Sequence, residues 1–297
     1  MRLRILVCIM AAVFMFGGCA TIGGMRPVQR MATDMMVPSL EDMVKTTLKS
    51  EDLINAQSLM ETVLPLLDGL IEFSPDNASL LTIAAEGYAL YSFGFVEDVD
   101  RQRAIKLYAK GKEYGMRALK QNSYFESALE DGEDFSEAVQ CLTEDDVAAA
   151  FYTGFGWAFW AMRSIQEGDV KAAFDLPKIT ALMDRVIELD DTFFEGGPRL
   201  FYGAYFGALG PSFGGGPKKA KTSFDKALEI SPNFLTTHYF NALYYAIPTM
   251  DEALFDKELT FVLDTPNNVL PEMALANAVA KVKARRLLNQ KWKYFVD

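Results

Sequence analysis

The stretch AKTSFDKALEISP, residues 220–232, is the most informative part of this chain. Its spacing is A-x3-F-x2-A-x4-P, carried by Ala220, Phe224, Ala227 and Pro232. The first three residues fall on one face of a helix, and the proline ends that helix. The two small residues let a second helix approach closely, and the phenylalanine between them fills the gap. The stretch therefore predicts a helix packed tightly against a neighbouring helix.

This spacing resembles the second helix of a tetratricopeptide repeat, a helix pair that recurs about every 34 residues. Pro266 follows Pro232 by 34 residues. The packing positions of a first helix lie between them, at His238, Asn241, Ala242 and Tyr245. Weaker copies of the pattern lie upstream, at Val63–Pro75, Leu81–Tyr88, Ala104–Gly111, Tyr152–Phe159, Ile179–Asp191 and Gly197–Ala204.

No run of alternating apolar and polar residues bounded by turn residues suggests a strand. We therefore predict an all-α fold, a tetratricopeptide-like helix-hairpin repeat array with irregular insertions. The alternative is a generic helical bundle in which the matches arise by chance.

The N-terminus predicts a lipoprotein signal peptide. Two arginines precede the apolar run Ile5–Phe16, which is too short to span a bilayer comfortably, and Gly17-Gly18-Cys19 follows. Small residues before a cysteine resemble a bacterial lipobox, in which cleavage before Cys19 leaves an acylated cysteine that anchors the protein to a membrane. A plain signal peptide with a chance cysteine is the alternative.

The chain then divides into three predicted segments: residues 1–18 as the signal peptide, 19–38 as a lipidated tether, and 39–297 as a single α-helical repeat domain. We expect Ser39 to cap the first helix and Pro65 to lie in the first turn of a later one. Thr143, followed by three acidic residues, is expected to cap another helix. No later segment is a long uninterrupted apolar run, so we expect no second membrane element.

Charge and residue usage exclude several classes of function. The net charge is −11, and loss of Arg2 and Arg4 with the signal peptide leaves −13, which argues against nucleic acid as a partner. Cys8 would be lost with the signal peptide and Cys19 would be lipidated, which leaves Cys141 alone. Neither a disulfide framework nor a cysteine metal site is therefore expected. The single histidine, His238, falls at a packing position. We therefore predict no metal, no cofactor and no enzymatic activity.

The order of several features along the chain resembles one family. They are the lipobox, Pro65, the aromatic run Tyr152–Trp160, Phe194-Glu195-Gly196-Gly197-Pro198-Arg199, and Pro211 with Gly214–Gly216. Together they are similar to the T-component lipoproteins of tripartite ATP-independent periplasmic (TRAP) transporters. The resemblance implies an α-helical repeat protein with a ligand cleft or pore, a homotrimer, and a periplasmic substrate-binding P-component as partner. Ala20 after the cysteine resembles the outer-membrane sorting pattern, so we expect a periplasm-facing protein anchored there.

The groove positions of the predicted first helices are aromatic, and such amphipathic side chains would contact an organic ligand. They are Trp157, Trp160, Tyr202, Tyr205 and Tyr239. Arg199, beside a helix start, is the candidate clamp for a carboxylate. Alternatively, the insertions cover this face and the aromatics are ordinary core, while Arg199 pairs with Glu195 or caps a neighbouring helix.

Two functions stay open at this point. One is an accessory of a solute transporter that binds a small, largely apolar organic ligand, possibly a carboxylate. The other is a repeat scaffold that binds peptide segments during envelope assembly. Aromatic, mostly uncharged groove positions favour the first.

Overall fold

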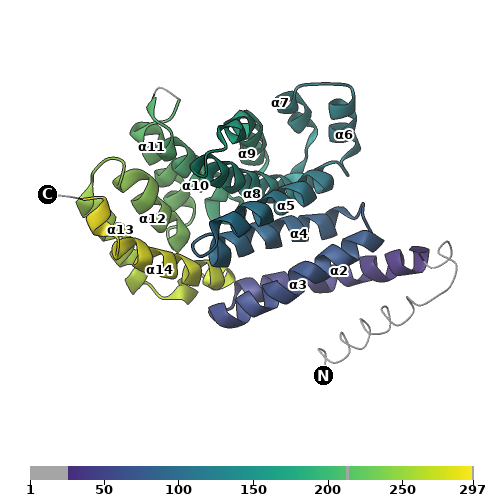
Figure 1. Ribbon diagram of the computed structural model, residues 1–297, viewed down its shortest axis with the longest axis horizontal. Helices are drawn as coiled ribbons and strands as arrows, with labels where there is room; N and C mark the ends of the chain where they lie inside the picture. The colour runs from purple at the N-terminus through teal and green to yellow at the C-terminus, as the bar shows by residue number, and fades with distance from the viewer. Residues whose placement is uncertain (1–25, 212–213, 296–297) are drawn as a thin grey trace.

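The computed structural model describes residues 26–211 and 214–295, and within these ranges the regular elements are all helical (Figure 1). The all-α prediction is confirmed, whereas the tetratricopeptide register stays a prediction. The signal peptide and Cys19 lie outside the described residues. The α-helices are α2 (Arg26–Leu48), α3 (Leu53–Phe73), α4 (Ala78–Tyr91), α5 (Arg101–Leu119), α6 (Ser123–Glu130), α7 (Phe135–Ala138), α8 (Val147–Gln166), α9 (Leu176–Asp190), α10 (Phe193–Ala208), α11 (Pro217–Ile230), α12 (Leu235–Asn241), α13 (Glu252–Asp264) and α14 (Ala274–Leu288).

Short segments of other helix types connect several of these elements. Two π-helical segments, η1 (Ser92–Val96) and η6 (Ala242–Ala246), directly continue α4 and α12. Two 3-10 segments, η3 (Glu144–Asp146) and η4 (Val170–Asp175), precede α8 and α9.

The first two described helices, α2 and α3, are longer than predicted, because each continues through a proline. The expectation that Ser39 starts a helix is wrong, because α2 already begins at Arg26 and runs through Pro38. Pro65 does not start a new helix either, since α3 continues through it. A proline inside a helix loses one backbone hydrogen bond. The burial of Val63 and Leu67 on either side of Pro65 offsets that loss.

Thr143 caps a helix start as predicted, that of η3, which leads directly into α8. The Asp146 carboxylate accepts a hydrogen bond from the Thr143 backbone N–H at 2.9 Å and completes a capping box. The helix that follows, α8, packs against α4, α5, α9 and α10 and is the central element of the fold.

Residues 220–230 form most of α11, which ends just before Pro232 and packs along α10. Ala220, Phe224 and Ala227 are completely buried. A Cβ atom at Gly203 of α10 would lie 2.6 Å from the Phe224 ring, so the absence of a side chain there makes the close approach possible. The predicted burial of Phe224 between two helices is confirmed.

The last helix returns to the first ones. α14 packs against α2 and α3 as well as against α12 and α13, so the last long helix lies beside the first two (Figure 1). The arrangement encloses a space between α4, α8 and these helices, and the candidate site lies there.

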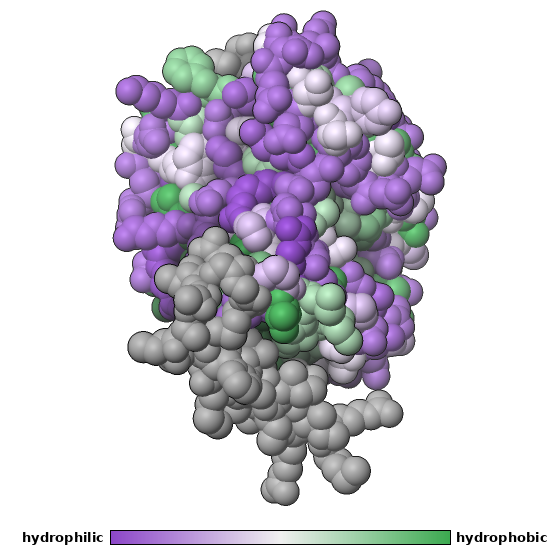
Figure 2. All heavy atoms as spheres, turned by 90° about the vertical axis from the view of Figure 1, so that its right-hand side faces the viewer, coloured by the Kyte–Doolittle hydropathy of each residue, from purple (hydrophilic) through white to green (hydrophobic). Residues whose placement is uncertain are grey.

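The face shown in Figure 2 is largely hydrophilic, with small hydrophobic patches, one of them in the centre of its lower half. One stretch of the described residues, Ala78–Val96, is long and apolar enough to cross a membrane by length and composition. In this fold 72% of that window is buried by other helices, which is the pattern of a core helix.

Candidate ligand-binding site

The aromatic residues predicted from the sequence do not meet in one place. Trp157 is buried in α8, where its indole Nε1 donates to the Asp175 carboxylate at 2.7 Å. Lys112 lies over both indoles, with Nζ 4.0 Å from the Trp157 ring centroid and 4.5 Å from that of Trp160. The same lysine pairs with Asp175 at 3.1 Å. These contacts fix the two tryptophans between α8, α5 and η4.

Tyr202 and Tyr205 lie on α10, facing α9. The Tyr202 hydroxyl donates to the Asp184 carboxylate, and burial raises the pKa of Tyr202 far above its usual value. Tyr205 packs against Phe201 with the rings stacked 5.6 Å apart. Tyr239, on α12, is buried beside Phe240.

Arg199 forms an ion pair with Asp191 at 2.8 Å rather than with Glu195. Its Nε is buried and has no hydrogen-bond partner among the described residues. The structure therefore shows one structural contact for this guanidinium, and its predicted role as a carboxylate clamp stays a prediction.

Two cavities lie close to these residues. The first, here called the central cavity, has a volume of about 80 Å³ and is bordered by α2, α3, α4, η1, α8, α10, α12 and α14. Its lining is almost entirely aliphatic and aromatic. Glu86 is the one ionisable side chain in that lining, and Thr47 and Thr236 are the hydroxyl-bearing ones.

A left-handed turn builds part of the central cavity wall. Phe194, Glu195 and Gly196 have φ values of 49°, 59° and 75°, which bulky residues rarely adopt. The turn places the Phe194 ring in the cavity lining, 5.4 Å from Phe151. Gly197 follows, and a Cβ there would lie 2.6 Å from the Phe151 ring. Backbone strain of this kind clusters at binding sites, where the surrounding packing maintains it.

The second, here called the lateral cavity, has a volume of about 310 Å³ and lies between α8, α9, α10, α12 and η6. This volume falls in the range of pockets for small organic molecules. Of the six predicted ligand-binding residues, Tyr205 borders it and the others border neither cavity. Gln166 and Tyr244 add polar atoms to a lining that is otherwise mainly apolar.

The two cavities share a wall. Phe155 of α8 and Leu200 of α10 line both. Both are hydrophobic side chains that can change rotamer without breaking a hydrogen bond. The two apolar cavities therefore adjoin at these two side chains.

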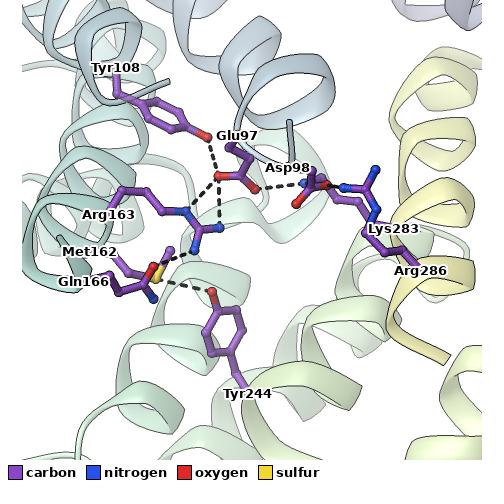
Figure 3. A network of polar contacts seen from close by, with 9 residues as sticks. All are labelled: Glu97, Asp98, Tyr108, Met162, Arg163, Gln166, Tyr244, Lys283 and Arg286. Atoms are coloured by element: carbon purple, nitrogen blue, oxygen red, sulfur yellow. Dashed lines mark hydrogen bonds and ion pairs between the residues drawn. The ribbon is translucent and has the colours of Figure 1, made fainter. Parts of the chain in front are cut away.

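A network of polar contacts centred on Glu97 connects several of these helices (Figure 3). The Glu97 carboxylate accepts from Lys283 Nζ at 2.8 Å, from the Arg163 guanidinium at 3.1 Å and from the Tyr108 hydroxyl at 2.9 Å. Asp98 also binds Lys283, at 2.9 Å. The network thus joins α5 and the turn after η1 to α8 and α14.

Each end of this network meets a cavity. Lys283 Nζ lies 4.3 Å above the ring of Phe93, which lines the central cavity. Arg163 donates to Gln166, and the Tyr244 hydroxyl donates to the Met162 sulfur. Gln166, Tyr244 and Met162 line the lateral cavity. Burial raises the pKa of Tyr244 to about 12, so its hydroxyl is neutral at physiological pH.

The remaining candidate for chemistry, His238, has a structural role. Its ring lies between the buried Glu258 carboxylate and the Pro232 carbonyl, and packs 4.3 Å from Phe261. Among the described residues no group of histidine, cysteine and acidic side chains could hold a metal ion.

Comparison with known proteins places this architecture in a family. The family model described as TRAP transporter T-component (TAtT) matches residues 49–295. This chain belongs to the TRAP transporter T-components. An uncharacterized protein of Treponema pallidum (strain Nichols) is 24% identical over 281 residues, which covers 86% of this chain and 84% of that protein. The resemblance predicted from the sequence is confirmed, and the family is one of transporter accessory components rather than of enzymes.

Sequence reasoning missed the residues that line the central cavity of this T-component. One signal was present, because Glu86 interrupts an apolar run of α4 that otherwise reads Leu80–Tyr91. A lone carboxylate in such a run predicts either a partner or a cavity.

Proposed function

We propose that this T-component binds a small, largely apolar organic ligand and exchanges it with the periplasmic substrate-binding P-component of a TRAP transporter. The ligand occupies the central and lateral cavities. The observation that carries the proposal is the pair of adjoining apolar compartments, separated by Phe155 and Leu200 and bordered by few polar groups. Apolar pockets with a few polar atoms are typical of sites for organic ligands.

In this proposal the protein is a homotrimer, anchored through Cys19 to the outer membrane and facing the periplasm. A native mass spectrum of the purified protein is expected to give three copies per particle. The same spectrum would reveal an organic molecule that stays bound during purification.

We expect the apolar fluorophore N-phenyl-1-naphthylamine to bind, and bulky side chains in the cavities to weaken that binding. Ala276→Phe narrows the central cavity and Ala204→Phe the lateral one, because both alanines line these spaces. Each should raise Kd about tenfold or more, the equivalent of about 1.4 kcal/mol. The measurement is a fluorescence titration, with circular dichroism to confirm the fold.

Two further variants identify the site. Thr222→Phe, at an exposed position of α11, is the matched control and should leave Kd within about twofold. Trp160→Ala tests the groove predicted from the sequence, since Trp160 borders neither cavity. Unchanged binding in both cavity variants, together with weakened binding in Trp160→Ala, would move the ligand to that groove.

The anchor has its own test. We expect Cys19→Ser to release the protein into the soluble periplasmic fraction, because acyl chains attached at this cysteine are the proposed membrane attachment. The measurement is cell fractionation followed by immunoblotting, with the wild-type protein as control. Recovery of Cys19→Ser in the detergent fraction would contradict lipid anchoring through this residue.

A further inference from the structure

Glu86 is placed unusually for a carboxylate. It lies on α4 and lines the central cavity, whose lining holds no other ionisable side chain. The Tyr152 hydroxyl donates to its Oε1 at 2.9 Å. The hydrogen bonds of the described residues include none to Oε2. One oxygen of Glu86 is thus held by Tyr152, and no described residue donates a hydrogen bond to the other.

The two buried glutamates of the described chain, Glu97 and Glu258, show what the partly exposed Glu86 lacks. Glu97 pairs with Lys283 and Arg163, and Glu258 pairs with His238. No lysine, arginine or histidine of the described residues lies within ion-pair distance of Glu86. Buried charges in proteins are normally paired, because an isolated carboxylate loses its hydration and gains nothing in return.

Burial accordingly raises the pKa of Glu86 to about 7, against a smaller opposite effect of the hydrogen bond from Tyr152. Burial also raises the pKa of Tyr152 well above its usual value, so this phenol stays neutral while Glu86 titrates. The lining contributed by α2, α3, η1, α8, α10, α12 and α14 carries no other titratable group. When Glu86 is ionised, no positively charged side chain of the cavity lining pairs with it.

We infer that the ligand of this T-component carries a protonated amine that pairs with Glu86, on an apolar body that extends along the central cavity towards Phe155. The inference rests on the proposed function and names the class of ligand for the same site. An ammonium group offers donors to the free Oε2 and supplies the missing positive charge. A carboxylate ligand would instead place two negative charges in one apolar enclosure, which disfavours binding.

The test is calorimetric titration with two probes of equal chain length, octylamine and octanoate, at about pH 8. In the wild-type protein octylamine should bind at least about tenfold more tightly, since hydrogen bonds between charged groups are worth that much or more. Glu86→Gln should abolish this preference. Glu72→Gln, which removes the same charge from an exposed position of α3, should change neither affinity by more than about twofold.

The pH dependence gives a second readout that needs no variant. Lowering the pH from about 8 to about 6 protonates Glu86 while octylamine stays charged. The affinity of the wild-type protein for octylamine should therefore fall about tenfold across this range, and the affinity for octanoate should not. Glu86→Gln should show no such change. At about pH 8 the Glu86→Gln protein should also unfold at a temperature at least as high as that of the wild type. The reason is that the pKa of Glu86 is raised in the folded state, so ionisation of this carboxyl destabilises the folded protein.

The outcomes separate the inference from the proposed function. Octanoate binding as tightly as octylamine, or octylamine affinity that is independent of both Glu86 and pH, would overturn the inference while leaving a ligand cavity. Binding of N-phenyl-1-naphthylamine without binding of octylamine would overturn it as well. Failure of all three probes to bind would count against the proposed function itself.

Discussion

Replacing Phe224 by alanine is expected to lower the free energy of unfolding by about 3–5 kcal/mol, the usual range for a buried phenylalanine. The side chain is completely buried between α10 and α11, against Gly203. Its removal leaves a cavity that tightly paired helices can fill only in part. Urea denaturation followed by circular dichroism measures the change.

The control for this prediction is Thr222→Ala, two residues earlier on an exposed face of α11. It should cost less than about 1 kcal/mol, because surface substitutions have small effects. A loss below about 1 kcal/mol for Phe224→Ala itself would show that the α10–α11 contact contributes little to stability.

Glu97→Ala is expected to cost a similar amount, about 3–5 kcal/mol, for a different reason. The substitution removes the shared partner of Lys283, Arg163 and Tyr108. The Tyr108 hydroxyl loses its acceptor, Lys283 keeps Asp98 alone, and Arg163 keeps Gln166 alone. Lys283 is only 2% exposed, so water cannot replace the lost contacts. The measurement is again chemical denaturation at neutral pH.

A matched control tests whether burial causes the effect. Lys221 and Asp225 form an ion pair on α11 with about half of each side chain exposed, at 55% and 50%. Asp225→Ala should therefore cost less than about 1 kcal/mol. Equal losses for Asp225→Ala and Glu97→Ala would mean that the buried network contributes no more than a surface pair.

The sequence was informative where local chemistry decides the structure. Thr143 caps its helix because the capping box lies within four residues, and Phe224 is buried because its neighbours on the same helix face are small. Pro65 misled the prediction, since the packing of α3 outweighs the local cost of a proline in the helix. Local signals therefore predicted helix content better than helix boundaries.

The candidate site was harder to predict because it is made of distant segments. The central cavity takes its lining from helices between Leu40 and Val279, and no local pattern indicates which of their faces meet. The motif around Phe194 was recognised from its residues. The left-handed backbone of this motif was not predicted, because packing against Phe151, which is distant in the sequence, helps to maintain that conformation.

The return of α14 to the start of the chain has a consequence for biogenesis. Lys283 and Glu97 are 186 residues apart in the sequence, and α14 also supplies part of the central cavity wall. Contacts between such distant residues form late, because the intervening chain must first be ordered. During synthesis and export, the helices up to α13 can pair with their neighbours as they emerge, but the central cavity lacks one wall until α14 has been made. Truncation shortly before α14 would thus leave a largely helical protein whose apolar interior is open to water.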